Sequence, residues 1–219
     1  MNQDGFLIRQ RIITHSECDR ISEHLLNQNS RKTRAGIRNL MSVPLIRELA
    51  NDKRLITILE ECTGKTLIPF KATLFEKTGK SNWLVAFHQD TALPVEKFIE
   101  LNGWGPMSVK EGIIFAHAPT RALAKIIALR IHLDASEYTN GPLRIIPGSH
   151  QKRLGDAEMK SWLVKDPFTC TVEKGGVIAM SPLILHASSK SIDDKPRRVL
   201  HIEYAESMEI DRDVRLATA

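Results

Sequence analysis

The amino-acid sequence predicts a mainly β fold with a helical annex, an α+β arrangement. The first 64 residues have helical periodicity and helix-start signals, whereas about eight short apolar segments separated by turn signals follow over the next ~140 residues. Such regularly spaced short strands favour a double-sheet jelly roll over a parallel α/β sheet. We expect the 219 residues to form one domain, with the annex over 1–64 and the jelly-roll core over 65–206.

Three helices are expected in the annex. Residues 14–17 form a Thr-x-x-Glu capping box, which is typical of a helix start. Pro44 indicates a second start, because proline is favoured in the first helical turn. A third helix is expected from about Asp52 to Cys62, with Gly64 as its stop. In each segment the apolar residues share one helical face: Cys18, Ile21, Leu25 and Leu26; Leu45, Ile46 and Leu49; Leu55, Ile58, Leu59 and Cys62.

The strands that follow are short and bounded by turns. Glycine- and proline-containing turn signals stand at 140–142, 147–149 and 174–176. The segment 93–111 lacks a strand pattern, and a loop of that length is either a lid over a substrate or a passive surface loop. The expected strands are 67–76, 84–88, 112–116, 125–134, 143–147, 168–172, 177–180 and 198–204.

One of these strands alternates between an apolar and a polar face. Its apolar face carries Ile127, Leu129, Ile131 and Leu133, and its other face carries Ala128, Arg130, His132 and Asp134. The alternation alone leaves open whether the polar face meets water or lines a cavity. Our hypothesis is that the apolar face packs against the helical annex, so that Arg130 and His132 point into the barrel. A buried guanidinium there needs an anionic partner.

Composition restricts the class of protein. Hydrophobic residues make up 42% and charged residues 26% of the chain, as in ordinary globular proteins. The net charge of +5, with basic residues scattered among acids, favours a small and anionic partner over nucleic acid. Cys18, Cys62 and Cys170 have no disulfide or zinc-site spacing, which favours the cytoplasm. No apolar run is long enough for a membrane span, and the oligomeric state stays open.

The strongest chemical signal is His88-Gln89-Asp90, followed by His186 and, eleven positions later, Arg197. Alternate side chains of a strand point the same way, so His88 and Asp90 can offer a nitrogen and an oxygen to one metal. Two histidines and one carboxylate on one face of ferrous iron leave positions open for a co-substrate and dioxygen. Arg197 opens a strand, where a guanidinium can hold a carboxylate through two parallel hydrogen bonds.

These residues carry a resemblance to a known family. The chain resembles the phytanoyl-CoA dioxygenase family of iron(II)- and 2-oxoglutarate-dependent oxygenases in its HxD motif, in His186 with Ser188, and in the spacing from His186 to Arg197. The most specific part is the stretch 140–150, which reads NGPLRIIPGSH. The resemblance covers nearly the whole chain and implies a double-stranded β-helix core of the jelly-roll, cupin-like type.

The resemblance also implies roles for individual residues. His88, Asp90 and His186 match the iron ligands, and Arg197, rather than Arg198, matches the residue that binds the distal carboxylate of 2-oxoglutarate. Further co-substrate contacts fall at Ser188, Thr73 and Arg130. Two positions depart from the family pattern: relatives often have an apolar or aromatic residue in place of Arg130, and many have asparagine in place of Ser191. Because Asp90 is retained, the halogenating variants of the family are not expected.

The function implied is a dioxygenase that uses iron(II), 2-oxoglutarate and dioxygen to hydroxylate an unactivated C–H bond of a small molecule, with succinate and carbon dioxide as co-products. Two alternatives belong to other classes. One is a non-catalytic jelly roll that binds a metal or ligand, against which the intact ligand set argues. The other is a cupin-like metalloenzyme that does not use 2-oxoglutarate, against which Arg197 argues. His117 and His132 are interpreted as structural residues, with substrate contacts or general bases as the alternatives.

Overall fold

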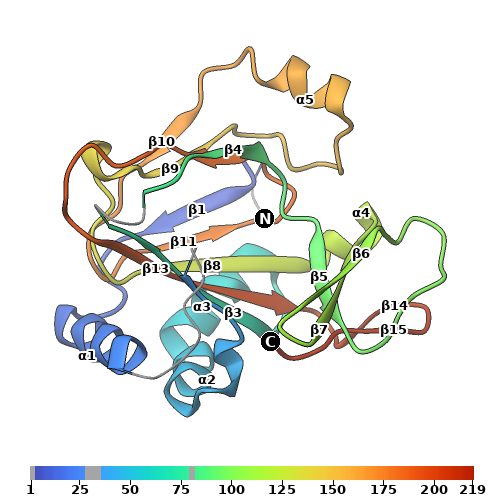
Figure 1. The fold of residues 1–219 in the computed structure, drawn as a ribbon, viewed down its shortest axis with the longest axis horizontal. Coiled ribbons are helices and arrows are strands. Elements are labelled where there is room, and N and C mark those ends of the chain that lie inside the picture. The colour runs from blue at the N-terminus through green and yellow to red at the C-terminus, as the bar shows by residue number, and fades with distance from the viewer. Residues whose placement is uncertain (1–2, 28–35, 79–81) are drawn as a thin grey trace.

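Two facing antiparallel sheets form the centre of the protein in the computed structural model, which describes residues 3–27, 36–78 and 82–219 (Figure 1). The larger sheet has the order β1-β11-β8-β13-β3-β2 and the smaller sheet β10-β9-β12-β4. This architecture confirms the predicted jelly roll with a helical annex. The larger sheet contains β1 (Phe6–Arg9), β2 (Gly36–Ile37), β3 (Ile68–Lys77), β8 (Ile126–His132), β11 (Val177–Met180) and β13 (Arg197–Ala205). The smaller contains β4 (Val85–His88), β9 (Leu143–Ile145), β10 (Phe168–Cys170) and β12 (His186–Ser188).

A third sheet stands beside one end of the barrel (Figure 1). It consists of β5 (Ala92–Val95), β7 (Ile113–His117) and β6 (Met107–Lys110), in the order β5-β7-β6. The expectation of a strand-free segment over 93–111 is therefore wrong. The pattern failed because β5 is buried at Leu93, Pro94 and Val95 in succession, so it shows no alternation. Pro94 is tolerated because β5 is an edge strand. A small hairpin of β14 (Glu209–Asp211) and β15 (Val214–Arg215) follows β13.

The three expected helices of the annex are present as α1 (His15–Asn27), α2 (Pro44–Ala50) and α3 (Lys53–Thr63). The capping box forms at α1, where the backbone N–H of Thr14 donates to Glu17 (2.8 Å) and that of Glu17 donates to the Thr14 hydroxyl (3.3 Å). Gly64 ends α3 in the left-handed conformation, with φ of 67°. Short helices that the sequence did not predict are η1 (Leu40–Ser42), α4 (Thr120–Leu123), η2 (Tyr138–Asn140) and α5 (Asp156–Trp162).

The annex covers one face of the larger sheet (Figure 1). Apolar residues of α1, α2 and α3 form one buried cluster with the apolar face of β8 and with Leu200, Ile202 and Tyr204 of β13. The hydroxyl of Tyr204 donates to the backbone oxygen of Ala50 (3.0 Å), which ties the sheet to α2. This packing confirms the predicted direction of the alternating strand. None of the helices in the described ranges has the length and apolar composition needed to cross a bilayer.

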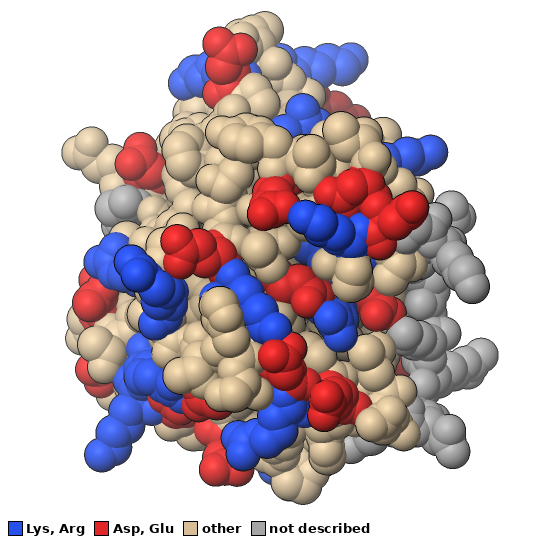
Figure 2. All heavy atoms as spheres, turned by 90° about the vertical axis from the view of Figure 1, so that its left-hand side faces the viewer, with Lys and Arg blue, Asp and Glu red and all other residues tan. Residues whose placement is uncertain are grey.

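The space between the two sheets is divided into an apolar and a polar part. Residues of β8, β9, β10 and β11, including Ala128, Ile145 and Ile178, fill one part with a buried apolar cluster. The part beside β3, β4 and β13 is lined by charged side chains. On the outer surface, Figure 2 shows basic and acidic side chains interspersed over the face that it presents.

The packing between β8 and the annex gives a test of the fold. Leu129 is fully buried in the cluster shared with the helices. Leu129→Ala is expected to lower the free energy of unfolding by about 2–5 kcal/mol, because it removes apolar contacts and leaves a cavity. Chemical denaturation measures this change. Val164→Ala, at an exposed valine, is the control and should change stability by less than about 0.5 kcal/mol. Equal effects of the two truncations would contradict the packing.

Candidate metal centre

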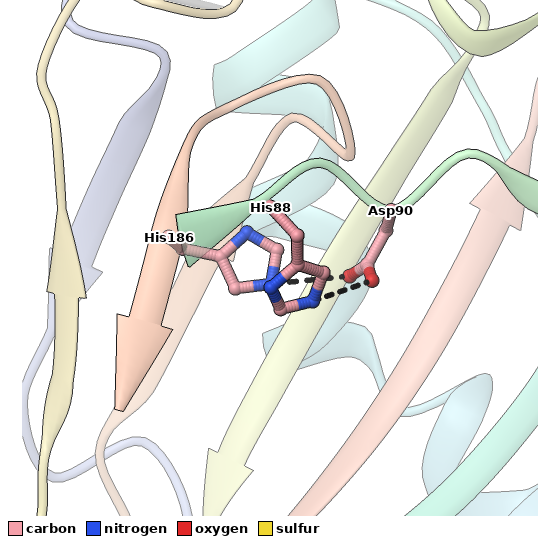
Figure 3. A group of neighbouring side chains, drawn as sticks. All are labelled: His88, Asp90 and His186. Atoms are coloured by element: carbon pink, nitrogen blue, oxygen red, sulfur yellow. Dashed lines mark ion pairs between the residues drawn. The ribbon is translucent and has the colours of Figure 1, made fainter. Parts of the chain in front are cut away.

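The three predicted metal ligands come together from two neighbouring strands (Figure 3). His88 ends β4, and its Cα is paired with that of His186, the first residue of β12. Asp90 lies two residues beyond His88, on the chain that leaves β4. The short spacing within the HxD motif and the cross-strand pairing of the two histidines therefore place all three side chains at one point.

The distances fit a single metal ion. Oδ1 of Asp90 lies 3.5 Å from Nε2 of His88, and Oδ2 of Asp90 lies 3.5 Å from Nε2 of His186. One ligand atom from each of the three residues lies within 4.8 Å of the other two. Two ligand atoms that bind one ion at right angles, with bonds of about 2.1 Å, are about 3 Å apart. Small side-chain movements would therefore bring these three residues into contact with one ion. The donor set of two imidazoles and one carboxylate suits ferrous iron.

The outer nitrogens of both rings are fixed by backbone carbonyls. Nδ1 of His88 contacts the oxygen of Ala86 and Nδ1 of His186 contacts the oxygen of Ile184, each at 2.9 Å. A carbonyl only accepts, so in each neutral ring Nδ1–H donates, which leaves the Nε2 lone pair free for a metal. Burial lowers the pKa of His186 to about 4, so this ring is neutral near pH 7.

The carboxylate of Asp90 is held in its ionised form. Burial alone would raise its pKa, but the neighbouring His186 and the hydrogen bond from His88 outweigh burial and hold the pKa well below its usual range. For His88 burial again favours the neutral form, and the contact with Asp90 outweighs it and raises the pKa. The ionised Asp90 and the neutral His186 are ready to bind a divalent cation, whereas the raised pKa of His88 means that a metal competes with a proton for its Nε2.

A cavity of about 100 Å³ adjoins the metal centre and collects positive charge. Its lining includes the three metal ligands and three cations, Lys77, Arg130 and Arg197, together with Phe75, Trp83, Val85, Leu143, Ala187 and Ser188. Among the described residues, no carboxylate lies within salt-bridge distance of these three cations. A buried cluster of this kind requires an anionic ligand.

The prediction that Arg197 faces the cavity is confirmed. Arg197 is 3% exposed and lines the cavity, and its Nε donates to the backbone oxygen of Asn140 (3.2 Å). Arg198 points to the other side of β13, where it forms a two-pronged ion pair with Asp134 (2.6 and 2.8 Å). Burial, followed by the charge of Arg130, lowers the pKa of Arg197 to about 9.

Arg130 also faces the cavity, as the alternating strand predicted. Its guanidinium lies over the ring of Phe75 (5.5 Å) and donates to Nδ1 of His201 (3.3 Å), while its Nε has no partner among the described residues. His132 is buried on the same face of β8, but it does not line the cavity and instead contacts the Ser136 hydroxyl (2.9 Å). Thus one of the two polar residues lies at the site and the other is structural.

Lys77 is the residue of this cavity that sequence reasoning missed. It is 1% exposed, and its Cα is paired with that of Arg197 across the β3–β13 ladder. Its ammonium donates to the Ser188 hydroxyl (2.7 Å) and to the backbone oxygen of Ser189. Burial, then the charges of Arg197 and Arg130, lowers its pKa to about 7. Extending the expected strand by one residue would have placed Lys77 on the same face as Thr73.

The other two expected co-substrate contacts differ in position. Ser188 lines the small cavity and accepts the hydrogen bond from Lys77. Thr73 does not line it; Thr73 lies in a larger cavity of about 320 Å³ that shares Phe75, His88 and Asp90 with the small one. His117 also lines this larger cavity, where its Nδ1 contacts the Thr91 hydroxyl (2.7 Å).

Comparison with known proteins agrees with this geometry. The family model described as phytanoyl-CoA dioxygenase matches residues 1–199. The chain belongs to the phytanoyl-CoA dioxygenase family. Membership confirms the enzyme class predicted from the sequence, an iron(II)- and 2-oxoglutarate-dependent dioxygenase. No curated protein sequence matches the chain.

Three solved structures share the fold of this chain. EctD from S. alaskensis in its apo form is 16% identical with a TM-score of 0.71, over 95% of this chain and 75% of that one. HygX from Streptomyces hygroscopicus, with nickel and 2-oxoglutarate bound, is 14% identical with a TM-score of 0.68, over 94% and 84%. AviO1 from Streptomyces viridochromogenes is 20% identical with a TM-score of 0.66, over 92% and 90%.

The metal site can be tested by removing one ligand. His186→Ala is expected to lower the affinity for iron(II) or nickel(II) by roughly 100-fold or more, beyond the 10–100-fold typical of partners that only orient ligands. Calorimetric titration under anaerobic conditions measures the affinity. His15→Ala, at an exposed position of α1, is the matched control and should bind as the wild type does. Unchanged metal affinity in His186→Ala would remove His186 from the ligand set.

Proposed function

We propose that the protein hydroxylates an unactivated C–H bond of a small molecule, with iron held by His88, Asp90 and His186. The observation that carries this proposal is the cationic cavity beside the three ligands. It offers an anion-binding end directly next to a metal-binding end, as a dicarboxylate that also contacts the metal requires. The single-domain organisation, with a mostly helical annex over 1–64 and a core over 65–206, is part of the same proposal, except that β1 and β2, within the first 64 residues, belong to the larger sheet of the core.

The co-substrate role of the small cavity follows from its charges. We assign the distal carboxylate of 2-oxoglutarate to Arg197 and Lys77, which lie opposite each other on β13 and β3. The Ser188 hydroxyl accepts from Lys77 and so orients the ammonium. Arg130 adds a third positive charge in the cavity wall. Thr73 remains a proposed contact, although it lies on the side of Phe75 that faces the larger cavity.

The protein supplies binding, orientation and exclusion of water. When bound, iron(II) supplies dioxygen activation coupled to oxidative decarboxylation of 2-oxoglutarate, which yields succinate and carbon dioxide. The carbonyls of Ala86 and Ile184 hold the two imidazoles in the orientation that presents Nε2. Phe75 and Trp83 wall the co-substrate cavity, which strengthens the attraction between its cations and a carboxylate by excluding water.

The substrate is proposed to be a small molecule bound in the larger cavity beside Asp90 and His88. Solved structures with this fold contain small molecules: EctD with 2-oxoglutarate and 5-hydroxyectoine, and HygX with 2-oxoglutarate and hygromycin B. The basic side chains in the cavity support an anionic substrate. Three buried cysteines without disulfides, Cys18, Cys62 and Cys170, support action in the cytoplasm.

The proposed activity can be tested without knowing the substrate. With iron(II), ascorbate and dioxygen, the wild type is expected to convert 2-oxoglutarate to succinate slowly, as measured by chromatography. Arg197→Ala should raise the Michaelis constant for 2-oxoglutarate by roughly 30-fold or more, because it removes a buried partner of the carboxylate. Arg198→Ala, whose guanidinium pairs with Asp134 instead, should change it by less than about threefold. Absence of succinate from the wild type would refute the activity.

A pH dependence follows from Lys77. Its pKa of about 7 in the free protein means that Lys77 loses its charge as the pH rises through neutrality. The groups that face it are the cations Arg130 and Arg197, with the metal ligands across the cavity. A bound carboxylate favours the ammonium form, so binding above pH 7 takes up a proton, and the affinity should fall by up to about tenfold per pH unit.

The measurement is calorimetric titration of nickel-loaded protein with 2-oxoglutarate between pH 6.5 and 8.5, in buffers with different ionisation enthalpies. Lys77→Met is expected to bind more weakly at pH 6.5 and to lose the proton uptake. Lys160→Met, on the exposed side of α5, is the control and should behave as the wild type. Proton uptake that persists in Lys77→Met would show that another group titrates.

A further inference from the structure

The larger cavity carries its own set of basic side chains, separate from those of the co-substrate site. It is lined by Arg38, Asn39, Lys71, Thr73, Phe75, His88, Gln89, Asp90, Thr91, Ala92, Lys110, Phe115, His117 and Ala219. Among these described residues three are lysine or arginine, and Asp90 is the only acidic one. Asp90 is assigned to the metal, and the carboxylates that pair with Lys71 and Arg38, those of Glu203 and Glu111, lie outside the lining.

The two cationic sites lie on opposite sides of Phe75 along one strand face. Alternate residues of β3 share a face, so Lys71, Thr73, Phe75 and Lys77 form one row. Lys77 lies in the small cavity, Lys71 in the large one, and Phe75 lines both. Lys71 is four positions from Phe75 and six from Lys77, which is roughly 13 and 20 Å of extended strand. The basic end of the larger cavity is therefore well separated from the co-substrate cations.

Lys71 is held in place from beneath the cavity. Its ammonium forms an ion pair with Glu203 (2.7 Å), and the Glu203 side chain is 3% exposed and lies outside the cavity lining. The same carboxylate oxygen, Oε1, also contacts Nε2 of His201 (3.1 Å). Glu203 thus fixes the position of Lys71 while the remaining N–H groups of the ammonium stay available to a ligand.

Lys110, which ends β6, lies near the same ring as Lys71, that of Phe115 on β7. The ammonium groups of Lys71 and Lys110 lie 5.8 and 5.3 Å from the centre of the Phe115 ring. Lys110 has no carboxylate partner among the described residues. Arg38, also in the lining, bonds to Glu111 (3.4 Å), which lies outside it. Two ammonium groups around one apolar ring suit an acid group attached to an apolar body.

We propose that the larger cavity binds the substrate through an oxyanion, a carboxylate or a phosphate, seated between Lys71 and Lys110, with an apolar part along Phe115 and Phe75 toward the metal. This assignment rests on the proposed oxygenase function, and it names the class of substrate. The separation along β3 places the acid group away from the metal. The carbon that reacts is therefore several bonds from the acid group.

Binding of simple probes tests this assignment without turnover. The probes are 4-phenylbutyrate, 3-phenylpropyl phosphate and the uncharged 4-phenylbutanol, titrated calorimetrically into protein loaded with nickel(II) and 2-oxoglutarate. At least one anionic probe is expected to bind tenfold or more tightly than the alcohol, and comparison of the two anions tells carboxylate from phosphate. Alcohol binding as tight as the better anion, or no binding of either anion below 10 mM, would overturn the proposal.

Variants locate the anion. Lys110→Met is expected to weaken the better anionic probe about tenfold or more, as for loss of a charged hydrogen bond. Because Lys71→Met alone leaves Glu203 buried without its ion-pair partner, the second variant is Lys71→Met/Glu203→Gln, with the same expected loss. Lys160→Met is the control and should bind as the wild type does. Anion binding unchanged in both lining variants would refute the assignment, whereas failure of the wild type to form succinate would instead refute the oxygenase function.

Discussion

The pairing of β13 between β3 and β8 is the constraint on which the site depends. Its register sets Arg197 opposite Lys77, His201 opposite both Thr73 and Arg130, and Glu203 opposite Lys71. Because side chains alternate across a strand, this register turns the polar residues of three strands toward the metal and their apolar residues toward the helices. A shift by one residue would expose the hydrophobic face and bury the wrong charges, so packing of the annex and geometry of the site are specified together.

The same register produces an electrostatic cost. Like charges directly opposite each other in a ladder destabilise the sheet, and Lys77 and Arg197 are such a pair, with Arg130 close by. Burial is the first cause of the lowered pKa of Lys77, and the charges of Arg197 and Arg130 lower it further. A carboxylate in the cavity relieves the repulsion and supplies the missing partner. The site is therefore less stable when empty than when it contains an anion.

The sequence was informative where a pattern is local. The starts of the three annex helices, the alternation of β8 and the HxD spacing depend on residues a few positions apart, and the sequence predicted them, whereas it missed the short helices such as α4 and α5. The pattern failed where burial is two-sided, as in β5, and where a strand boundary moved by one residue, which hid Lys77. The sequence also could not reveal that Nδ1 of His201 accepts a hydrogen bond from Arg130. That contact arises from pairing between β8 and β13, which are 71 positions apart at these residues.

The ion pair of Lys71 with Glu203 restricts how this protein can vary. Replacing one partner alone leaves a buried charge without its counterpart, which costs about 3–5 kcal/mol, whereas replacing both with apolar residues of similar size costs much less. The two positions are therefore expected to change together among close homologues, 132 residues apart in sequence. Glu203 contacts His201, and His201 contacts Arg130 in the co-substrate cavity. A homologue that replaces Lys71 and Glu203 is therefore expected to change the hydrogen bonds on the co-substrate side as well.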